Sequence, residues 1–276
     1  MTNQQHHRSF LKWAGGKFKL LNLIAQHLPT SATRTVEPFA GSAVFSLNLG
    51  RGNAIINDLN ADVINLYKHL VSDYETTLAE LKILFVPSNN AKDAYLSLRT
   101  EFNTISSSPR KSALFVYLNK HGFNGLVRYN GSNKFNVPFG SYKSVSLPED
   151  EIKHFAQTCK DFSFASDDYN TTLASLTAGD VAYLDPPYAA STVFATNFTS
   201  YTKTGFSVAD QLNLVSHAIK AKEAGATTII SNHYTPDTAI LYKDASTLET
   251  FEVSRSISAS ADKRIPVQEC LAIYSP

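Results

Sequence analysis

Short apolar runs alternate with longer stretches of helical spacing along the chain, and this alternation predicts an α/β fold. Strands are expected at the apolar runs 35–37, 54–56, 162–165, 181–184, 227–231, 249–254 and 267–274. Helices are expected where apolar residues recur at every third or fourth position, at 17–28, 42–49, 111–120, 149–160, 208–222 and in segments between 60 and 105. The order strand, glycine turn, helix, strand and acid at the start of this series is typical of a nucleotide-binding βαβ unit.

The α/β alternation is interrupted between residues 61 and 148. Helical spacing dominates the first part of this stretch. In its second part, glycines surround the short extended run Lys134 to Val137, which indicates a loop and a β-hairpin. We therefore predict a catalytic domain formed by residues 1–60 and 149–276, and an inserted, mainly helical domain with a β-hairpin over residues 61–148.

The composition is that of a globular protein, with 43% hydrophobic residues. No apolar run approaches the roughly 20 residues of a membrane span, and the polar start of the sequence lacks the apolar core of a signal peptide. Cys159 and Cys270 stand apart, without the spacing of a zinc site or a disulfide framework. We expect a cytoplasmic protein, monomeric in solution, with no membrane association and no metal site.

Charge is distributed unevenly, although the formal net charge is only +1. Residues 102–148 contain no Asp or Glu, but they contain Arg110, Lys111, Lys120, Arg128, Lys134 and Lys143. Aromatic residues are interleaved with these cations, at positions 115, 117, 123, 129, 135, 139 and 142. Such a stretch suits contacts with the phosphates and bases of a nucleic acid. On composition alone, a helix pair and hairpin with a solvated basic face is the alternative.

The glycine turn after the first strand, in VEPFAGSAVF, indicates a nucleoside ligand. The turn lacks the GxGxxG of dinucleotide sites, and the sequence contains no GxxxxGK[ST] phosphate loop. A glycine turn still lets a ligand approach the backbone, and Asp58, which ends the second strand, is placed to accept both hydroxyls of a ribose. A nucleoside without a pyrophosphate, such as S-adenosylmethionine, satisfies these conditions. The alternative for Asp58 is a cap of the helix that follows.

The apolar strand 181–184 runs directly into Asp185-Pro186-Pro187-Tyr188. Each proline fixes φ and lacks an N–H, so the segment is stiff and its carbonyls are exposed. If the Asp185 carboxylate and the Pro186 carbonyl each accept one N–H of an adenine amino group, they hold the nitrogen lone pair toward an incoming methyl group. Tyr188 supplies a ring on which the base can stack. Cytosine N4, an RNA base and a glutamine side chain are alternative acceptors.

Together these motifs resemble the Dam family of DNA adenine-N6 methyltransferases. The resemblance is carried, in family order from Phe10 onward, by FLKWAGGKFKLL, VEPFAGSAVF, YLNKHGFNGLVRYN, FNVPFGSYK, YLDPPY, ATNFTSY and RSIS. It implies a Rossmann-like S-adenosylmethionine-dependent methyltransferase fold with an inserted target-recognition domain. It also implies S-adenosyl-L-methionine as the methyl donor, S-adenosyl-L-homocysteine as the product, double-stranded DNA as the substrate, GATC as the target, and flipping of the adenine out of the duplex.

The resemblance implies three sets of site residues. The cofactor would be bound by Trp13, Lys17, Phe39, Gly41, Asp58, Asp168, Tyr169 and Asp185. The catalytic segment would be Asp185, Pro186, Pro187 and Tyr188. DNA would be bound by Lys12, Phe123, Asn124, Leu126, Arg128, Asn130, Pro138, Tyr142 and Asn197. Within this last set Lys12 and Arg128 match guanine-reading positions, and arginine paired with guanine is the commonest specific base contact. Asn124 and Leu126 match positions near the vacated base stack, and Pro138 matches one beside a thymine methyl.

Three positions depart from the family pattern: Ala43 at a usual glycine, Phe123 at a usual tyrosine, and Ser141 at a usual arginine. The alanine leaves the local contacts with the cofactor undetermined. The phenylalanine can still stack on a base, but it lacks the hydroxyl that a tyrosine would use for a hydrogen bond. The third removes a cation, which would weaken DNA affinity or relax one position of the target. A DNA-binding module that keeps the fold without catalysis is a further alternative, although the residues matched to the catalytic segment are all present.

The segment 189–206 has neither helical nor strand periodicity, and it follows Tyr188 directly. A loop of this length in a compact domain is usually either functional or disordered. We expect it to be mobile without DNA and to become ordered when the target adenine enters, with Asn197, Phe198 or Tyr201 contacting the DNA. An ordinary surface loop is the alternative.

Overall fold

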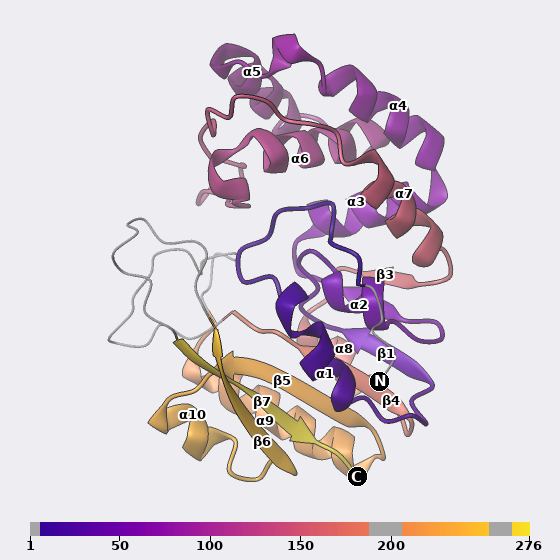
Figure 1. The fold of residues 1–276 in the computed structure, drawn as a ribbon, viewed down its shortest axis with the longest axis vertical. Coiled ribbons are helices and arrows are strands. Elements are labelled where there is room, and N and C mark those ends of the chain that lie inside the picture. Colours follow the sequence, from indigo (N-terminus) through magenta and orange to yellow (C-terminus); the bar gives the residue numbers. More distant parts are fainter. Residues whose placement is uncertain (1–5, 188–205, 254–266) are drawn as a thin grey trace.

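The computed structural model describes residues 6–187, 206–253 and 267–276 (Figure 1). Outside the described residues lie Tyr188 and most of the segment 189–206, including Asn197, Phe198 and Tyr201. The expectations for these residues therefore stay predictions. None of the described helices is long and apolar enough to span a membrane.

The strands of the described residues form a seven-stranded sheet in the order β3-β2-β1-β4-β5-β7-β6 (Figure 1). They are β1 (Arg34–Glu37), β2 (Ile55–Asn57), β3 (Ser163–Ala165), β4 (Asp180–Leu184), β5 (Thr227–His233), β6 (Thr247–Val253) and β7 (Val267–Tyr274). Strands β1 to β5 are parallel, whereas β7 runs antiparallel to both β5 and β6. All seven strands expected at the apolar runs are present, within two residues at either end.

The carboxyl ends of β1 and β4 meet where the chain changes direction across the sheet. From β1 the chain moves outward through β2 to β3, and it then crosses to β4 on the other side of β1. In open parallel sheets this reversal leaves a crevice beyond the carboxyl ends of the two neighbouring strands. Glu37 ends β1, and Asp185 directly follows β4. The topology therefore places the acid of the Asp-Pro-Pro segment at the edge where a ligand is expected.

Helices cover both faces of the sheet. They are α1 (Leu21–Gln26), α2 (Val44–Leu49), α8 (Tyr169–Ala174), α9 (Val208–Glu223) and α10 (Pro236–Leu241), with the 3-10 turn η1 (Phe18–Leu20) before α1. Val181 and Tyr183 of β4 pack in a cluster with residues of α1 and α2, whereas Ala182 and Leu184 pack with residues of α8 and α9. This division follows from the two-residue period of a strand, and a strand buried along its whole length is typical of the centre of a parallel sheet.

Helices α8 and α10 are absent from the sequence-based prediction. Each has only six residues, so helical spacing has no room to show. Their caps are the signal that the sequence does contain. The side chain of Asp168 accepts the N–H of Asn170 at 2.8 Å, and Thr235 forms a capping box with Thr238, with Pro236 at the first helical position.

The inserted segment forms a layer of helices above the sheet in Figure 1. The layer contains α3 (Ala61–Ser72), α4 (Tyr74–Leu84), η2 (Pro87–Asn89), α5 (Lys92–Phe102), α6 (Pro109–His121) and η3 (Phe123–Gly125), followed by α7 (Glu149–Thr158). Helix α6 is buried almost all round because α3, α4 and α5 pack against it. Ile56 of β2, Val63 of α3 and Leu114 of α6 belong to one hydrophobic cluster, so the core runs without a break from the sheet into the helices.

The extended run that was expected to form a β-hairpin makes isolated bridges and no strand in the described residues. Side chains of α5 bind its backbone groups instead. The carbonyl of Val137 accepts from the Tyr95 hydroxyl at 3.0 Å and from Arg99 Nη1 at 2.8 Å. The side chain of Asn103 is bonded to both the N–H and the carbonyl of Phe135, at 2.8 and 3.0 Å. The run is therefore held against a helix, and the hairpin is reduced to a folded-back loop.

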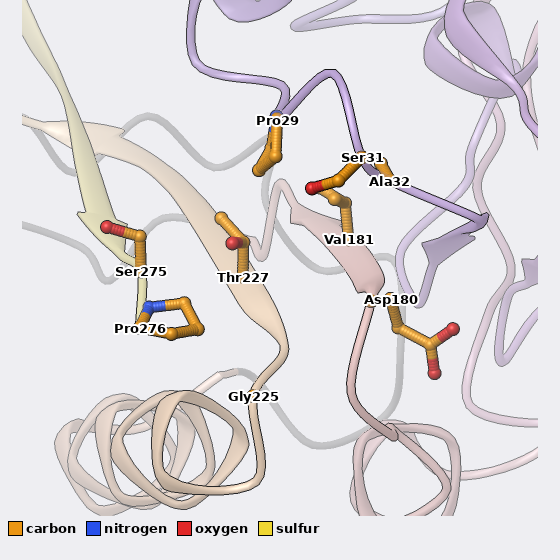
Figure 2. A pocket seen from close by; sticks show the side chains of 10 residues that line it. Pro29, Ser31, Ala32, Asp180, Val181, Gly225, Thr227, Ser275 and Pro276 are labelled. Atoms are coloured by element: carbon orange, nitrogen blue, oxygen red, sulfur yellow. The ribbon is translucent and has the colours of Figure 1, made fainter.

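The amino ends of the parallel strands, opposite the crevice, surround a pocket of ≈ 250 Å³ (Figure 2). Its lining includes Pro29, Gly179, Asp180, Thr227 and Ser275. The carboxylate of Asp180 is 3% exposed, and it accepts hydrogen bonds from Arg34 Nε and Thr177 N at 2.9 and 2.8 Å. Asp180 and Arg34 are register partners of β4 and β1. The acid at this pocket therefore ties the two central strands together.

Replacement of Asp180 by asparagine is expected to lower the free energy of unfolding by about 1 to 3 kcal/mol, because Arg34 loses the buried charge that it binds. Chemical denaturation at neutral pH measures this loss. Glu149→Gln is the matched control, since its ion pair with Lys82 is exposed on both sides and exposed pairs contribute little. Equal losses in the two variants would contradict a structural role for Asp180.

Candidate active site

Asp185 and Lys17 form an ion pair at the carboxyl end of β4. The ammonium of Lys17 lies 2.8 and 2.9 Å from the two carboxylate oxygens of Asp185, and it also donates to the carbonyl of Gly15 at 2.9 Å. Burial is the largest single effect on the pKa of Lys17 and lowers it, but the charge and hydrogen bond of Asp185, together with the nearby acidic groups of Tyr183 and Glu269, outweigh burial, and the pKa is raised. Lys17 is therefore charged at neutral pH, and its charge favours an ionised Asp185. Pro186, which follows, is buried.

A second carboxyl group lies deeper at the same edge. Glu37 is 3% exposed, and its Oε2 accepts the N–H of Ser46, in the first turn of α2, at 3.0 Å. Burial raises the pKa of Glu37 to about 8; hydrogen bonds from Ser46 oppose the shift and the charge of Asp185 adds to it. Glu37 therefore keeps its proton at neutral pH, whereas the neighbouring Asp185 is paired with a cation.

The glycine turn after β1 brings the backbone close to Trp13. Gly41 has a φ of +48°, and a Cβ at this position would lie 2.5 Å from the indole Nε1 of Trp13. Only glycine suits both this backbone conformation and this approach. The carbonyl of Gly41 accepts from the Tyr67 hydroxyl at 2.5 Å, and its N–H donates to Oδ2 of Asp58 at 2.8 Å. The glycine turn is therefore fixed by contact with Trp13 and by hydrogen bonds to Tyr67 and Asp58.

Asp58 and Asn57 join the loops that follow β1, β2 and β3. The second carboxylate oxygen of Asp58 accepts the N–H of Asn60 at 2.8 Å, and burial raises the pKa of Asp58 against the effect of its two hydrogen bonds. The N-cap of α3 is Asn60, so Asp58 is not the cap itself. The side chain of Asn57 donates to the carbonyls of Pro38 and Asp167 at 3.0 Å each, and it accepts the N–H of Asp167 at 2.9 Å.

Aromatic rings gather at the side of the turn that faces α8 and α9. The ring centroid of Tyr169 lies 5.3 Å from that of Phe39 and 5.7 Å from that of Phe206. Phe39 and Phe206 meet edge to face, with centroids 5.8 Å apart. The Tyr169 hydroxyl accepts from Asn213 Nδ2 at 3.1 Å, and Asp168 beside it is exposed. Aromatic faces next to exposed acceptors suit a planar base with an amino group.

A second group of predicted residues lies where the N-terminal segment meets the helical layer. The ammonium of Lys12 lies 4.1 Å from the ring centroid of Tyr142 and donates to the carbonyl of Lys120 at 3.3 Å. The fully buried Asn119 accepts the N–H of Lys12 at 2.9 Å and donates to the carbonyls of Lys12 and Gly125 at 2.8 and 2.9 Å. Burial and the nearby charge of Lys12 lower the pKa of Lys120 to about 8. Positive charge is thus concentrated beside the loop after α6.

The loop after α6 presents most of the other predicted residues to solvent. Exposed side chains are Phe123, Asn124, Arg128, Asn130 and Pro138. Asn136 orients the guanidinium of Arg128. Nε of Arg128 donates to the side-chain Oδ1 of Asn136 at 2.7 Å, and Nη2 of Arg128 donates to the backbone carbonyl of Asn136 at 3.3 Å. Arginine has further N–H donors for an outside partner. Leu126 differs from the others, because it is only 9% exposed and belongs to the hydrophobic core.

Two cations of the basic stretch bind acids of other helices. Arg110 donates to Glu101 at 2.7 and 3.0 Å and to Glu80 at 3.1 Å. Lys111 lies 3.4 Å from Asp62. The stretch has no acids of its own, but α3, α4 and α5 supply carboxylates to these two residues, so their charge is balanced within the protein.

Comparison with known proteins bears on both groups of residues. Residues 13–256 match the family described as D12 class N6 adenine-specific DNA methyltransferase. The chain belongs to this family. This methyltransferase is 43% identical over 270 residues to the DNA adenine methylase of Vibrio cholerae serotype O1, an alignment that covers 98% of this chain and 96% of the relative. It is 40% identical over 269 residues to the DNA adenine methylases of Salmonella typhi and Escherichia coli K12, with the same coverage.

Family membership confirms several expectations from the sequence. The protein is an adenine-specific DNA methyltransferase, so it acts on DNA and uses a methyl donor. Its α/β fold is the one expected of an S-adenosylmethionine-dependent methyltransferase, with the sheet built as predicted.

Sequence reasoning missed several residues that lie beside the predicted site residues. They are Glu37, Asn57 and Phe206, Leu59, which directly follows Asp58 and is exposed, and Asn119, which is buried and supports Lys12. Two of them had a signal: Glu37 is an acid that ends a strand at a glycine turn, and Leu59 is a large apolar residue directly after Asp58. Asn57 and Asn119 had none, because each bonds a partner more than a hundred residues away.

Glu37→Gln is expected to make stability less dependent on pH. The pKa of folded Glu37, about 8, lies above its ordinary value of 4.5, so the folded protein keeps this proton where the unfolded chain has lost it. The free energy of unfolding should therefore fall as pH rises from about 5 to 8, by at most about 1.4 kcal/mol per pH unit from this group. Urea unfolding across this range should show a gain for E37Q that grows with pH. Parallel curves for the two proteins would rule out a protonated Glu37.

Proposed function

We propose that this methyltransferase transfers a methyl group from S-adenosylmethionine to the N6 amino group of adenine in GATC sites of double-stranded DNA, after flipping the base out of the duplex. The observation that carries the proposal is the ion pair of Lys17 and Asp185 at the switch point of the sheet. This ion pair supports an acidic acceptor at the edge of the sheet where ligands bind in open parallel sheets. The relatives named DNA adenine methylase support the choice of acceptor, and the family resemblance supports GATC.

The described residues fit S-adenosylmethionine, which when bound supplies an electrophilic methyl group on a sulfonium. Asp58 accepts two backbone N–H groups, and a carboxylate has further lone pairs for the hydroxyls of a ribose. Gly41 lets a ligand approach the backbone, and Trp13 closes one side of the turn. Phe39 and Tyr169 offer ring faces to the adenine of the donor.

Further residues complete the proposed donor site. Leu59 is 56% exposed beside Asp58 and offers an apolar surface to a ring. Asp168 is exposed at the start of α8 and can accept from an amino group. Lys17 and Asp185 carry opposite charges, as the amino-acid part of the donor does, and charge-assisted hydrogen bonds are the strong ones.

Asp185 and Pro186 act on the amino group of the target adenine. Its lone pair is delocalised into the ring, so the nitrogen is a poor nucleophile. The Asp185 carboxylate accepts one N–H and the Pro186 carbonyl the other, which turns the lone pair toward the methyl group. Lys17 favours the ionised, accepting form of Asp185. Pro187 restricts Pro186 to extended geometry, and stacking of the base on Tyr188 stays a prediction.

Residues 61–148 form the proposed target-recognition domain, inserted into a catalytic domain of residues 1–60 and 149–276. Arg128 and Lys12 read guanines from the exposed loop and its border with the N-terminal segment. Phe123, 45% exposed, fills the stack vacated by the adenine. Flanking contacts come from Asn124, Asn130, Pro138 and Tyr142. Leu126 supports the loop from the core side, since it is buried in the free protein.

Digestion of methylated plasmid tests the proposal. Plasmid incubated with the protein and S-adenosylmethionine should resist a nuclease blocked by methylated GATC and become sensitive to one that requires it. If neither digestion changes, the protein is a catalytically silent DNA-binding module. Finding N4-methylcytosine in hydrolysed DNA would show that cytosine is the acceptor instead of adenine. Methylation of RNA alone would show that the acceptor is an RNA base. A monomeric state and a cytoplasmic location stay predictions.

Asp185→Ala is expected to reduce methyl transfer on the order of 10²-fold or more, because the amino group loses its charged acceptor. Incorporation of labelled methyl groups into duplex DNA measures the loss. Asp167→Ala is the control, since Asp167 is exposed and is bonded to Asn57 through its backbone. An Asp185 variant that folds and retains more than a few per cent of wild-type turnover would remove this residue from catalysis.

Arg128→Ala is expected to weaken binding to a GATC duplex by about 1 to 3 kcal/mol and binding to a random duplex much less, because one bidentate base contact is lost. Fluorescence anisotropy at fixed salt measures both. Arg110→Ala is the matched control, since Arg110 is bonded to Glu101 and Glu80, and should alter neither affinity. Equal losses on both duplexes would make Arg128 a phosphate contact.

A further inference from the structure

Residues 12–17 connect the two groups of site residues, and we call them the connecting segment. At its start, both backbone groups of Lys12 are bonded to Asn119 of α6. At its end, Lys17 is paired with Asp185 beyond β4. Five peptide units span at most about 18 Å when fully extended. The Cα atoms of Lys12 and Lys17 are therefore at most about 18 Å apart, and a single short stretch of chain joins the loop proposed to bind DNA to the acid proposed to bind the substrate.

The middle of the connecting segment touches the glycine turn. Trp13 directly follows Lys12, and its indole is so close to Gly41 that a single added carbon would lie 2.5 Å from Nε1. The N–H of Gly41 is in turn bonded to Asp58. A shift of Lys12 therefore moves Trp13, and Trp13 cannot move toward the turn without displacing Gly41 and the hydrogen bond to Asp58.

Asn119 fixes the start of the connecting segment to the DNA-facing loop. Its side chain is fully buried and bonds the backbone of Lys12 and the carbonyl of Gly125 together. Gly125 has a φ of +64°, and a Cβ there would lie 2.3 Å from Cβ of Lys12. The backbone of the loop at Gly125 thus packs directly against the side chain of Lys12, and the amide of Asn119 joins the two. Asn119 is itself shielded from any ligand, so its effect must be transmitted through these neighbours.

We propose that Asn119 is a positioning residue that couples recognition of DNA by the loop after α6 to binding of the methyl donor at the glycine turn. The inference rests on the proposed function, which assigns the loop to DNA and the turn to S-adenosylmethionine. When cognate DNA orders the loop, it also orders Lys12 and Trp13 through Asn119. The site at the glycine turn then binds S-adenosylmethionine more tightly. Linkage requires the converse as well, so the donor raises affinity for cognate DNA by the same factor.

The chain contains a single tryptophan, Trp13, so intrinsic fluorescence reports directly on the connecting segment. S-adenosylhomocysteine is titrated into the protein with and without saturating GATC duplex. For the wild type, the duplex should tighten binding by about 5-fold or more, a typical coupling between sites. In Asn119→Ser, binding without DNA should stay within about 2-fold of wild type, the coupling should fall below about 2-fold, and the duplex should no longer change Trp13 emission.

Asn103→Ser is the matched control. Asn103 makes the same kind of amide bridge to the backbone, but to Phe135 and away from the connecting segment. It should keep the wild-type coupling. If both serine variants lost coupling equally, the role of Asn119 would be only to stabilise the helical layer, as Asn103 does. That result would overturn the inference.

Gly125→Ala provides a second route to the same readout. Its Cβ would lie 2.3 Å from Cβ of Lys12 and displace Lys12, while the side chain of Asn119 itself is unchanged, so coupling should fall here too, even if Asn119→Ser does not fold. The inference would be overturned if Gly125→Ala kept the wild-type coupling. It would also be overturned if the affinity of the wild-type protein for S-adenosylhomocysteine were the same with and without the duplex. A wild-type protein that binds no S-adenosylhomocysteine under either condition would instead overturn the proposed function.

Discussion

The buried ion pair of Lys17 and Asp185 is the interaction on which the rest of the site depends. Lys17 is 6% exposed, and an ammonium withdrawn from water to this extent is stable only when a carboxylate faces it. The pair therefore fixes the N-terminal segment across the carboxyl edge of the sheet. Once Lys17 is placed, the residues before it have few possible paths, and the path taken puts Trp13 against Gly41 and Lys12 against the loop after α6. A single electrostatic requirement thus brings the glycine turn, Asp185 and the loop after α6 within reach of one short stretch of chain.

Around this pair, irregular backbone is held by asparagine side chains. Asn57, Asn103 and Asn119 each accept a backbone N–H and donate to one or more carbonyls of a distant loop. Loops that lie against a core need such partners, because a buried backbone group without a hydrogen bond is costly. An amide supplies donor and acceptor without bringing a charge, whereas an acid or a lysine at the same place would add one. The same chemistry therefore shapes the donor site, the support of the recognition loop and the junction between them.

The sequence was sufficient for the strands, the glycine turn and the Asp-Pro-Pro segment, because each is set by local spacing or by the geometry of glycine and proline. It was insufficient wherever a residue's role depends on a partner far along the chain. Phe135 and Val137 have the pattern of a strand, yet α5 binds their backbone groups and no ladder forms. Arg110 lies in an acid-free stretch, yet it is paired with two glutamates from other helices. Such outcomes depend on tertiary contacts, and neither composition nor periodicity contains them.

Ala43 adopts a backbone conformation that glycine takes freely and an alanine takes only with strain. Ala43 has a φ of +52°, which costs an L-residue roughly 1 to 2 kcal/mol relative to glycine. Its methyl group is fully buried in the hydrophobic cluster that also contains Phe10, and such burial returns about 0.8 kcal/mol. Its N–H and carbonyl are bonded to Ala40 and Leu47, so the turn keeps the left-handed conformation that glycine would take freely. Ala43 therefore stores backbone strain in a turn whose Gly41 is bonded to Asp58 and lies beside Trp13.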